Sequence, residues 1–309
     1  MSAQDGKRGR TTGRFPAVVT AALAATVIIA WGTNYPLLKL AVQDMPPLTF
    51  SALRSLGGAV IVALLILGGR LGPLLPPKEE RVRFAVVGIL QFALVIGLAT
   101  VAMLVLPAGR TVAIIYTMPL WAALFDMLLL GRRLTPRQVL GIAVSLAGLL
   151  LFLDPMVLAW GDPGVPLGTA LVLTAAVGWG LGAVLYKSYQ WKASFLSQTL
   201  WQLLTSGVVF VVLALVLENP LESRFTVNLV LILLWNFIVP SAVAIWAWSR
   251  VLDRMSPSVA GQMLMSTPFV GIVASAIIFG EDIPPVFAAS TLLIIVGGVL
   301  VLLRQHRAT

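Results

Sequence analysis

Long runs of apolar residues, separated by short polar segments, follow one another along this chain of 309 residues. Most runs approach the about 20 residues that an α-helix needs to cross a bilayer. The apolar positions are continuous within each run, whereas a membrane β-barrel would alternate apolar and polar positions. We therefore expect an all-α membrane protein of ten transmembrane helices, at residues 17–38, 47–68, 84–105, 109–131, 136–153, 166–187, 195–217, 227–248, 257–279 and 285–303.

Composition supports this pattern and excludes a water-soluble globule. Hydrophobic residues make up 59% of the chain and charged residues 11%, against roughly 45–50% and about 25% in a soluble domain. Residues 1–16 carry four basic residues, like the start of a signal peptide, but the apolar run after them is too long for a signal-peptide core. We expect a basic cytoplasmic tail followed by a retained first helix.

The distribution of basic residues tests the number of helices independently. If the N-terminus is cytoplasmic, only Lys39, Arg110 and Arg224 lie outside the cell, and Arg54 lies within the second helix. The other basic residues then fall in cytoplasmic segments, as the positive-inside rule requires. We expect an inner-membrane protein with both termini in the cytoplasm. Because the net charge of +9 is spread over alternate loops, it does not indicate a nucleic-acid partner.

The chain offers little to enzyme chemistry. It has no cysteine, and its single histidine, His306, lies near the C-terminus. Disulfides, thiolate nucleophiles and clustered histidine ligands are therefore excluded. An intramembrane hydrolase would need paired acids, an activated serine or a metal within its helices, so we expect no enzyme, no cofactor and no metal.

The two halves of the chain resemble each other at a nearly constant offset. We expect a cytoplasmic tail at 1–16, a five-helix repeat at 17–153, a periplasmic loop at 154–165, a second five-helix repeat at 166–303 and a cytoplasmic tail at 304–309. Because five is odd, the second repeat would enter the membrane inverted, an arrangement found in transporters that expose one central cavity to each side in turn. The matching positions, offset by 148 or 149 residues, are Trp31-Gly32 and Lys39 with Trp179-Gly180 and Lys187; Thr117, Pro119 and Gly131 with Ser266, Pro268 and Gly280; and Gly148 with Gly297.

These motifs, over residues 17–305, resemble the EamA-like branch of the drug/metabolite transporter superfamily. The resemblance implies two inverted five-helix repeats around a central cavity and a function like that of bacterial exporters of amino acids and other metabolites. In this family the fourth helix of a repeat usually ends in Gly-Glu. The second half has Gly280-Glu281, whereas the first half has Gly131-Arg132, a departure from the family pattern.

Aromatic residues and prolines near the helix centres are the first candidates for the site. Broken or kinked helices at matching positions of two repeats mark transporter sites, so Pro119 and Pro268 are expected to kink their helices, with or without substrate contact. A tryptophan deep in a membrane needs a partner for its N–H group and therefore tends to face inward. The expected aromatic lining consists of Trp31, Trp121, Trp179, Tyr35 and Tyr116, with helix packing or an interfacial position as the alternative.

Polar side chains within the helices are the second group of candidates. Gln91 and Asn236 lie in the middle of the third and eighth helices, and either line the cavity or hydrogen-bond between helices. Arg54 and Asp126 are ionisable groups inside helices, which points to gating or charge recognition, although side chains near a helix end can also extend to the surface.

These residues describe an aromatic and amide-lined cavity without a strong negative charge. We expect an exporter of neutral or zwitterionic metabolites, most plausibly amino acids including aromatic ones, that works by alternating access. The alternative function is efflux of drugs or other metabolites, and a third hypothesis is a non-transporting membrane scaffold. Glycines and other small residues in the fifth and tenth helices could pack within one bundle or between two protomers, so monomer and homodimer both stay open.

Overall fold

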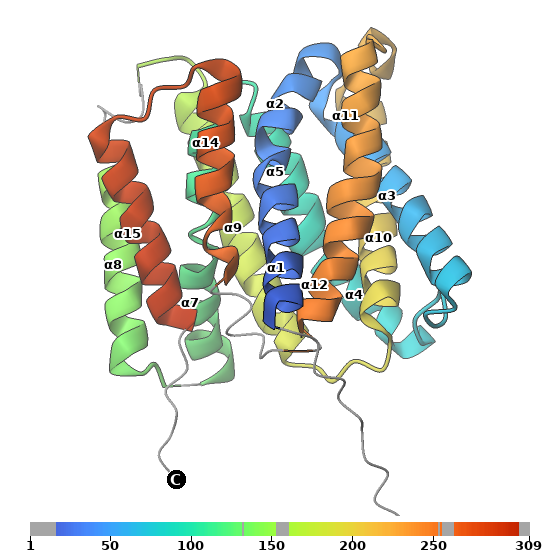
Figure 1. Cartoon of the computed structure of the whole chain (residues 1–309), viewed down its shortest axis with the longest axis horizontal. Coiled ribbons are helices and arrows are strands. Elements are labelled where there is room, and N and C mark those ends of the chain that lie inside the picture. The colour runs from blue at the N-terminus through green and yellow to red at the C-terminus, as the bar shows by residue number, and fades with distance from the viewer. Residues whose placement is uncertain (1–16, 132, 153–160, 253, 255–262, 303–309) are drawn as a thin grey trace, which may run out of the picture.

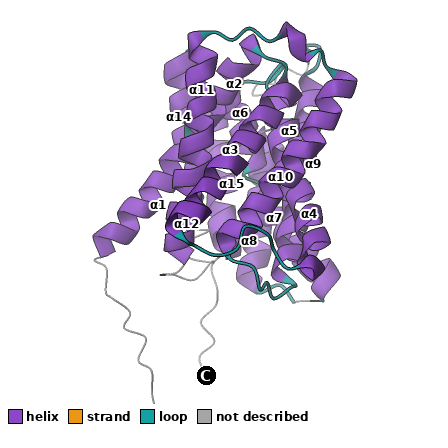
Figure 2. Ribbon diagram, turned by 90° about the vertical axis from the view of Figure 1, so that its right-hand side faces the viewer, coloured by secondary structure: helices purple, strands orange, loops and turns teal. Residues whose placement is uncertain are grey.

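The computed structural model describes residues 17–131, 133–152, 161–252, 254 and 263–302, and within these ranges the secondary structure consists of helices joined by loops, without strands. Figure 1 shows the helices side by side in one bundle. In Figure 2 they run between two ends at which the connecting loops gather. The expectation of an all-α protein is confirmed.

The longer helices follow one another in chain order, and several are interrupted. In the first half they are α1 (Ala17–Gly32), α2 (Asn34–Asp44), α3 (Pro47–Gly69), α4 (Arg81–Gly88), α5 (Leu94–Ala102), α6 (Ala108–Ile115), α7 (Met118–Leu130) and α8 (Pro136–Phe152). In the second half they are α9 (Val165–Lys187), α10 (Phe195–Leu217), α11 (Val227–Ile238), α12 (Ala244–Leu252), α14 (Thr267–Phe279) and α15 (Pro285–Leu302).

The surface of the bundle is apolar and its interior contains polar groups, the reverse of a soluble protein. Leucine, valine and isoleucine side chains such as Val216 and Ile277 are about three-quarters exposed, whereas Ser51, Thr100 and Ser206 are fully buried. Within the described ranges, seven continuous helical segments are long and apolar enough to cross a bilayer, and three shorter apolar ones lie at 136–151, 267–279 and 285–301. Such a surface requires a hydrocarbon environment, and the chain is a multi-pass membrane protein.

Several boundaries differ from the expected ones. The first segment continues to Asp44 and is interrupted at Thr33, and the third begins at Arg81 instead of residue 84. The segment expected at 109–131 is two helices, α6 and α7, separated at Tyr116 and Thr117. Part of the segment expected at 257–279 lies outside the described residues.

Both candidate kink prolines occupy the second position of a helix, Pro119 in α7 and Pro268 in α14. The first turn of a helix leaves its N–H groups without intrahelical partners, so proline loses no hydrogen bond there. In the first half the helix is therefore interrupted before the proline, and the proline lies in the first turn of the next helix.

Two wide π-helical turns continue neighbouring helices. One lies between α4 and α5 at Ile89–Ala93 and the other between α11 and α12 at Val239–Val243. The first residues of the two turns, Ile89 and Val239, are 150 positions apart, so the turns fall at matching places in the two halves. Turns of this kind are uncommon and are found mostly at functional sites.

Small residues allow α8 and α15 to pack in close contact at one edge of the bundle (Figure 1). A Cβ atom added to Gly148 of α8 would lie 2.8 Å from the carbonyl oxygen of Ser290 in α15, and one added to Gly141 would lie equally close to that of Gly297. The expected close packing of these two helices therefore occurs within one chain.

Candidate substrate cavity

A cavity of about 1090 Å³ lies inside the bundle, between helices of both halves. Its wall includes α1, α2 and α3 from the first part of the chain, both wide turns, and residues of α7 and α9. The wall also includes Arg133, which is exposed in the connection between α7 and α8. We call this the Arg133 end of the bundle.

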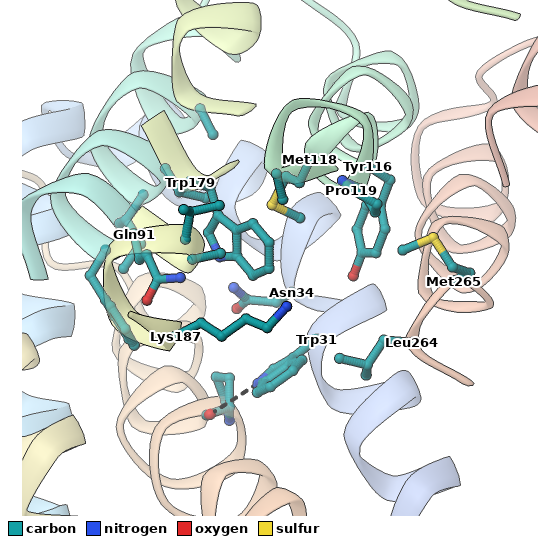
Figure 3. Close-up of a pocket in the computed structure, with 18 of the residues that line it drawn as sticks. Trp31, Asn34, Gln91, Tyr116, Met118, Pro119, Trp179, Lys187, Leu264 and Met265 are labelled. Atoms are coloured by element: carbon teal, nitrogen blue, oxygen red, sulfur yellow. Dashed lines mark hydrogen bonds between the residues drawn. The ribbon is translucent and has the colours of Figure 1, made fainter. Parts of the chain in front are cut away.

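Aromatic side chains dominate the middle of the cavity. Trp31, Tyr35, Tyr116 and Trp179 all line it, and Figure 3 shows three of them around one central space. The indole N–H of Trp31 donates to the carbonyl oxygen of Pro240, at 3.2 Å, in the second wide turn (Figure 3). A helix interior has few free carbonyl groups, so the irregular turn supplies the acceptor that a deep tryptophan requires.

Gln91, Arg54, Asp126 and Pro119 also line the cavity. Gln91 lies at the centre of the first wide turn, and Figure 3 shows its amide directed toward the space beside Trp179. The structure thus brings together most of the candidate residues from distant parts of the chain. Their contact with a substrate stays a prediction.

Three candidates lie outside the lining of this cavity. The indole N–H of Trp121 donates to the hydroxyl of Thr117, at 3.1 Å, one turn earlier on the same helical segment. Asn236 is fully buried, and its amide nitrogen donates to the carbonyl of Ile232 at 2.9 Å. Pro268 is buried at the start of α14. The indole of Trp121 and the amide nitrogen of Asn236 therefore have local partners, whereas Oδ1 of Asn236 has none among the described residues.

A loose ion pair lies toward the Arg133 end of the cavity. The Nζ atom of Lys187 lies 3.9 Å from a carboxylate oxygen of Asp126, and both residues line the cavity. The lysine side chain is 53% exposed, and in Figure 3 it extends into the space between Asn34 and Trp31. An ion pair of this length and exposure contributes at most about 1 kcal/mol.

The opposite end of the bundle is held by Glu281, and we call it the Glu281 end. Its two carboxylate oxygens accept hydrogen bonds from the backbone N–H groups of Ala108 and Gly109, at 3.0 and 3.1 Å. These are the first residues of α6, where N–H groups lack partners and the helix dipole favours a negative charge. The contact joins the end of α14 to the start of α6.

Lys39 completes this contact. Its Nζ atom lies 3.7 Å from Glu281 and donates to the carbonyl of Leu106 at 3.2 Å. The two side chains are 24% and 16% exposed, so this pair is better shielded from water than the pair at the Arg133 end. Neither residue lines the cavity, so its wall does not include this ion pair.

Sequence reasoning missed several of these residues. Asn34 and Ser55 line the cavity and are buried, and the rule applied to Gln91, that a buried amide must face inward, applies to Asn34 as well. Lys39 and Lys187 were not among the candidates, although their equivalence in the repeat was a usable signal. The contact of Glu281 with α6 had no signal, because it joins residues 173 positions apart.

Comparison with known proteins finds a family and a solved structure that match this chain. The sequence profile of the EamA-like transporter family matches residues 18–154 and again residues 166–303. A protein of solved crystal structure shares the fold with a TM-score of 0.66 over 93% of this chain and 96% of its own, at 19% identity.

Curated relatives cover most of both chains. The uncharacterized transporter YoaV of Bacillus subtilis is 26% identical, over 89% of this chain and 91% of its own. The uncharacterized inner membrane transporter YedA of Escherichia coli K12 is 26% identical over 92% and 90%. A probable amino-acid metabolite efflux pump of Escherichia coli K12 is 24% identical over 89% and 92%. With the family profile matched twice, this chain belongs to the EamA-like transporter family and is a multi-pass membrane transporter.

Proposed function

We propose that this transporter exports small zwitterionic or neutral metabolites, chiefly amino acids including aromatic ones, from the cytoplasm. The observation that carries the proposal is the cavity in which Trp31, Trp179, Tyr35 and Tyr116 meet the polar groups of Gln91 and Arg54. Aromatic faces suit an apolar side chain, and a few well-placed polar groups suit charged ends. The similarity to an amino-acid metabolite efflux pump supports the same substrate class.

We propose further that transport proceeds by alternating access between two inverted five-helix repeats with ten membrane crossings. The asymmetry of the two ends supports this: exposed Arg133 lines the cavity at one end, whereas Glu281 and Lys39 join helices at the other end and do not line it. If both termini are cytoplasmic, the Arg133 end faces the cytoplasm and the structure is inward-facing. Return to the outward-facing state then requires Glu281 to leave the start of α6.

Transport in reconstituted liposomes tests the proposal. Purified protein is expected to exchange radiolabelled phenylalanine, and more slowly leucine, with unlabelled amino acid inside. Ala183→Trp, which places an indole in the cavity wall, is expected to reduce this exchange at least about tenfold because it fills the site. Val212→Trp is the matched control, since Val212 is 55% exposed on the outer surface of α10. Absence of exchange for every amino acid, alongside exchange of drug-like cations, would refute the amino-acid assignment.

A further inference from the structure

Three polar atoms in the cavity wall lack a hydrogen-bond partner within the described part of the chain: Arg54 Nε, Ser55 Oγ and Asn34 Oδ1. Asn34 is 5% exposed and Ser55 is fully buried. An unpaired buried polar group costs about 1–3 kcal/mol, and more when it is charged. Three such atoms on the adjoining helices α2 and α3 therefore call for a ligand that supplies their partners.

The donor and acceptor types of these atoms define what they can bind. The Nε–H of arginine and the hydroxyl of serine are donors suited to the two oxygens of a carboxylate, and arginine is the side chain best matched to that group. The carbonyl oxygen of asparagine accepts a hydrogen bond and suits an ammonium group. A carboxylate beside an ammonium is the head group of an α-amino acid.

The charges around the cavity favour one monoanionic group at this place. Among the described residues that line it, Asp126 is the only acid, and it lies with Lys187 toward the Arg133 end. No described carboxylate lies within ion-pair distance of Arg54. The guanidinium therefore has no counter-ion from these residues, and a single arginine is too little charge for a phosphate dianion, which several basic groups bind.

We propose that Arg54, Ser55 and Asn34 form a cradle for the α-carboxylate and α-ammonium groups of the substrate. The inference rests on the proposed function and narrows it to free α-amino acids. Asn34 follows Trp31 by three residues across the break at Thr33, and Figure 3 shows its amide between Trp31 and Trp179. A head group held by the cradle leaves its side chain among these indoles, which favours aromatic and large aliphatic amino acids.

Competition with analogues that each lack one group of the substrate tests the cradle. Exchange of labelled phenylalanine in liposomes is measured with phenylalanine, phenylalaninamide, phenethylamine and 3-phenylpropionate as inhibitors. A site built for a hydrogen-bonding group rejects analogues without it. The two compounds without a carboxylate are expected to inhibit at least about thirtyfold more weakly than phenylalanine, and 3-phenylpropionate, which lacks the ammonium, about tenfold more weakly.

Variants assign the discrimination to individual residues. Arg54→Met is expected to abolish the preference for phenylalanine over its amide, whereas Arg224→Met, which removes an exposed arginine outside the cavity, is expected to retain it. Because Ser55 Oγ has no partner among the described residues, Ser55→Ala is expected to leave the thermal midpoint unchanged or raised while weakening phenylalanine inhibition about threefold to tenfold. This variant keeps the test decisive if Arg54→Met does not fold.

The outcomes separate this inference from the proposed function. Exchange of phenylalanine with equal inhibition by phenylalaninamide would overturn the cradle and leave amino-acid export standing. Unchanged discrimination in both Arg54→Met and Ser55→Ala would do the same. A wild-type protein that exchanges none of the carboxylate compounds would overturn both.

Discussion

The carboxylate of Glu281 makes the contact that we expect to set how often the Glu281 end opens. In Glu281→Gln one oxygen can still accept from the start of α6, but the second acceptor is replaced by an NH₂ group and the charge is lost. One hydrogen bond to a charged group is worth about 1.5–3 kcal/mol, and the shielded pair with Lys39 adds up to about 1 kcal/mol. A total loss of about 1.5–4 kcal/mol multiplies the open fraction about tenfold to about 900-fold.

Cysteine labelling measures this fraction directly, because the wild-type chain has no cysteine. Leu38 is buried, lines the cavity and lies next to Lys39. In spheroplasts, Leu38→Cys is expected to react slowly with a membrane-impermeant maleimide when Glu281 is present. The same cysteine is expected to react at least about tenfold faster in the Glu281→Gln background, which is the smallest increase in the open fraction estimated above.

The matched control is Glu222→Gln, because Glu222 is an exposed glutamate in the connection between α10 and α11. This variant removes the same charge and should leave the labelling rate unchanged. A rate for Glu281→Gln within twofold of wild type would refute the reasoning, since it would mean that the contact with α6 does not limit opening. Equal acceleration by Glu222→Gln would refute it too, since the effect would then be general electrostatics.

Three further predictions concern the frame around the cavity. Gly148→Leu places a side chain against the backbone of α15 and is expected to lower the stability of the fold by about 1–3 kcal/mol. Size-exclusion chromatography should show this as a loss of monodisperse protein. The control Gly68→Leu, with no atom within 4 Å of the added Cβ, should stay monodisperse. Glu80 is fully buried and accepts from two backbone N–H groups before α10, at 2.8 and 3.2 Å, so Glu80→Gln is expected to lower the thermal midpoint, and an unchanged midpoint would contradict this. An impermeant maleimide should label Gly161→Cys in intact spheroplasts but Ser188→Cys only after permeabilisation; the reverse pattern would contradict the expected orientation of the second half.

The helical framework could be predicted from the sequence because each segment carries its own signal. A run such as 195–217 is long and apolar enough to identify a membrane helix without any knowledge of its neighbours, and α10 spans Phe195–Leu217 as expected. Trp31 and Trp179 were found by their depth and their repeat equivalence, and both line the cavity.

Features that depend on contacts between distant segments could not be predicted in this way. Nothing near Glu281 in the chain indicates that its partners are N–H groups at the start of α6. Trp121 has the same depth signal as Trp31, but a threonine one turn away satisfies its N–H group and it lies outside the cavity wall. Depth and polarity narrow the candidates, and only the packing decides which of them share a cavity.

The wide turn at Ile89–Ala93 has a consequence for how this segment tolerates change in length. A π turn accommodates one residue more than an α-helical turn does, so removing one residue there would restore a regular helix without breaking the span. The wide turn absorbs its extra residue, so the helix before it and the helix after it keep nearly the relative orientation of one continuous α-helix. A single-codon deletion at this turn would thus yield a protein that inserts in the membrane normally and keeps Val95 and Ala99 on the cavity side of α5, while the wall loses the irregular turn that carries Gln91.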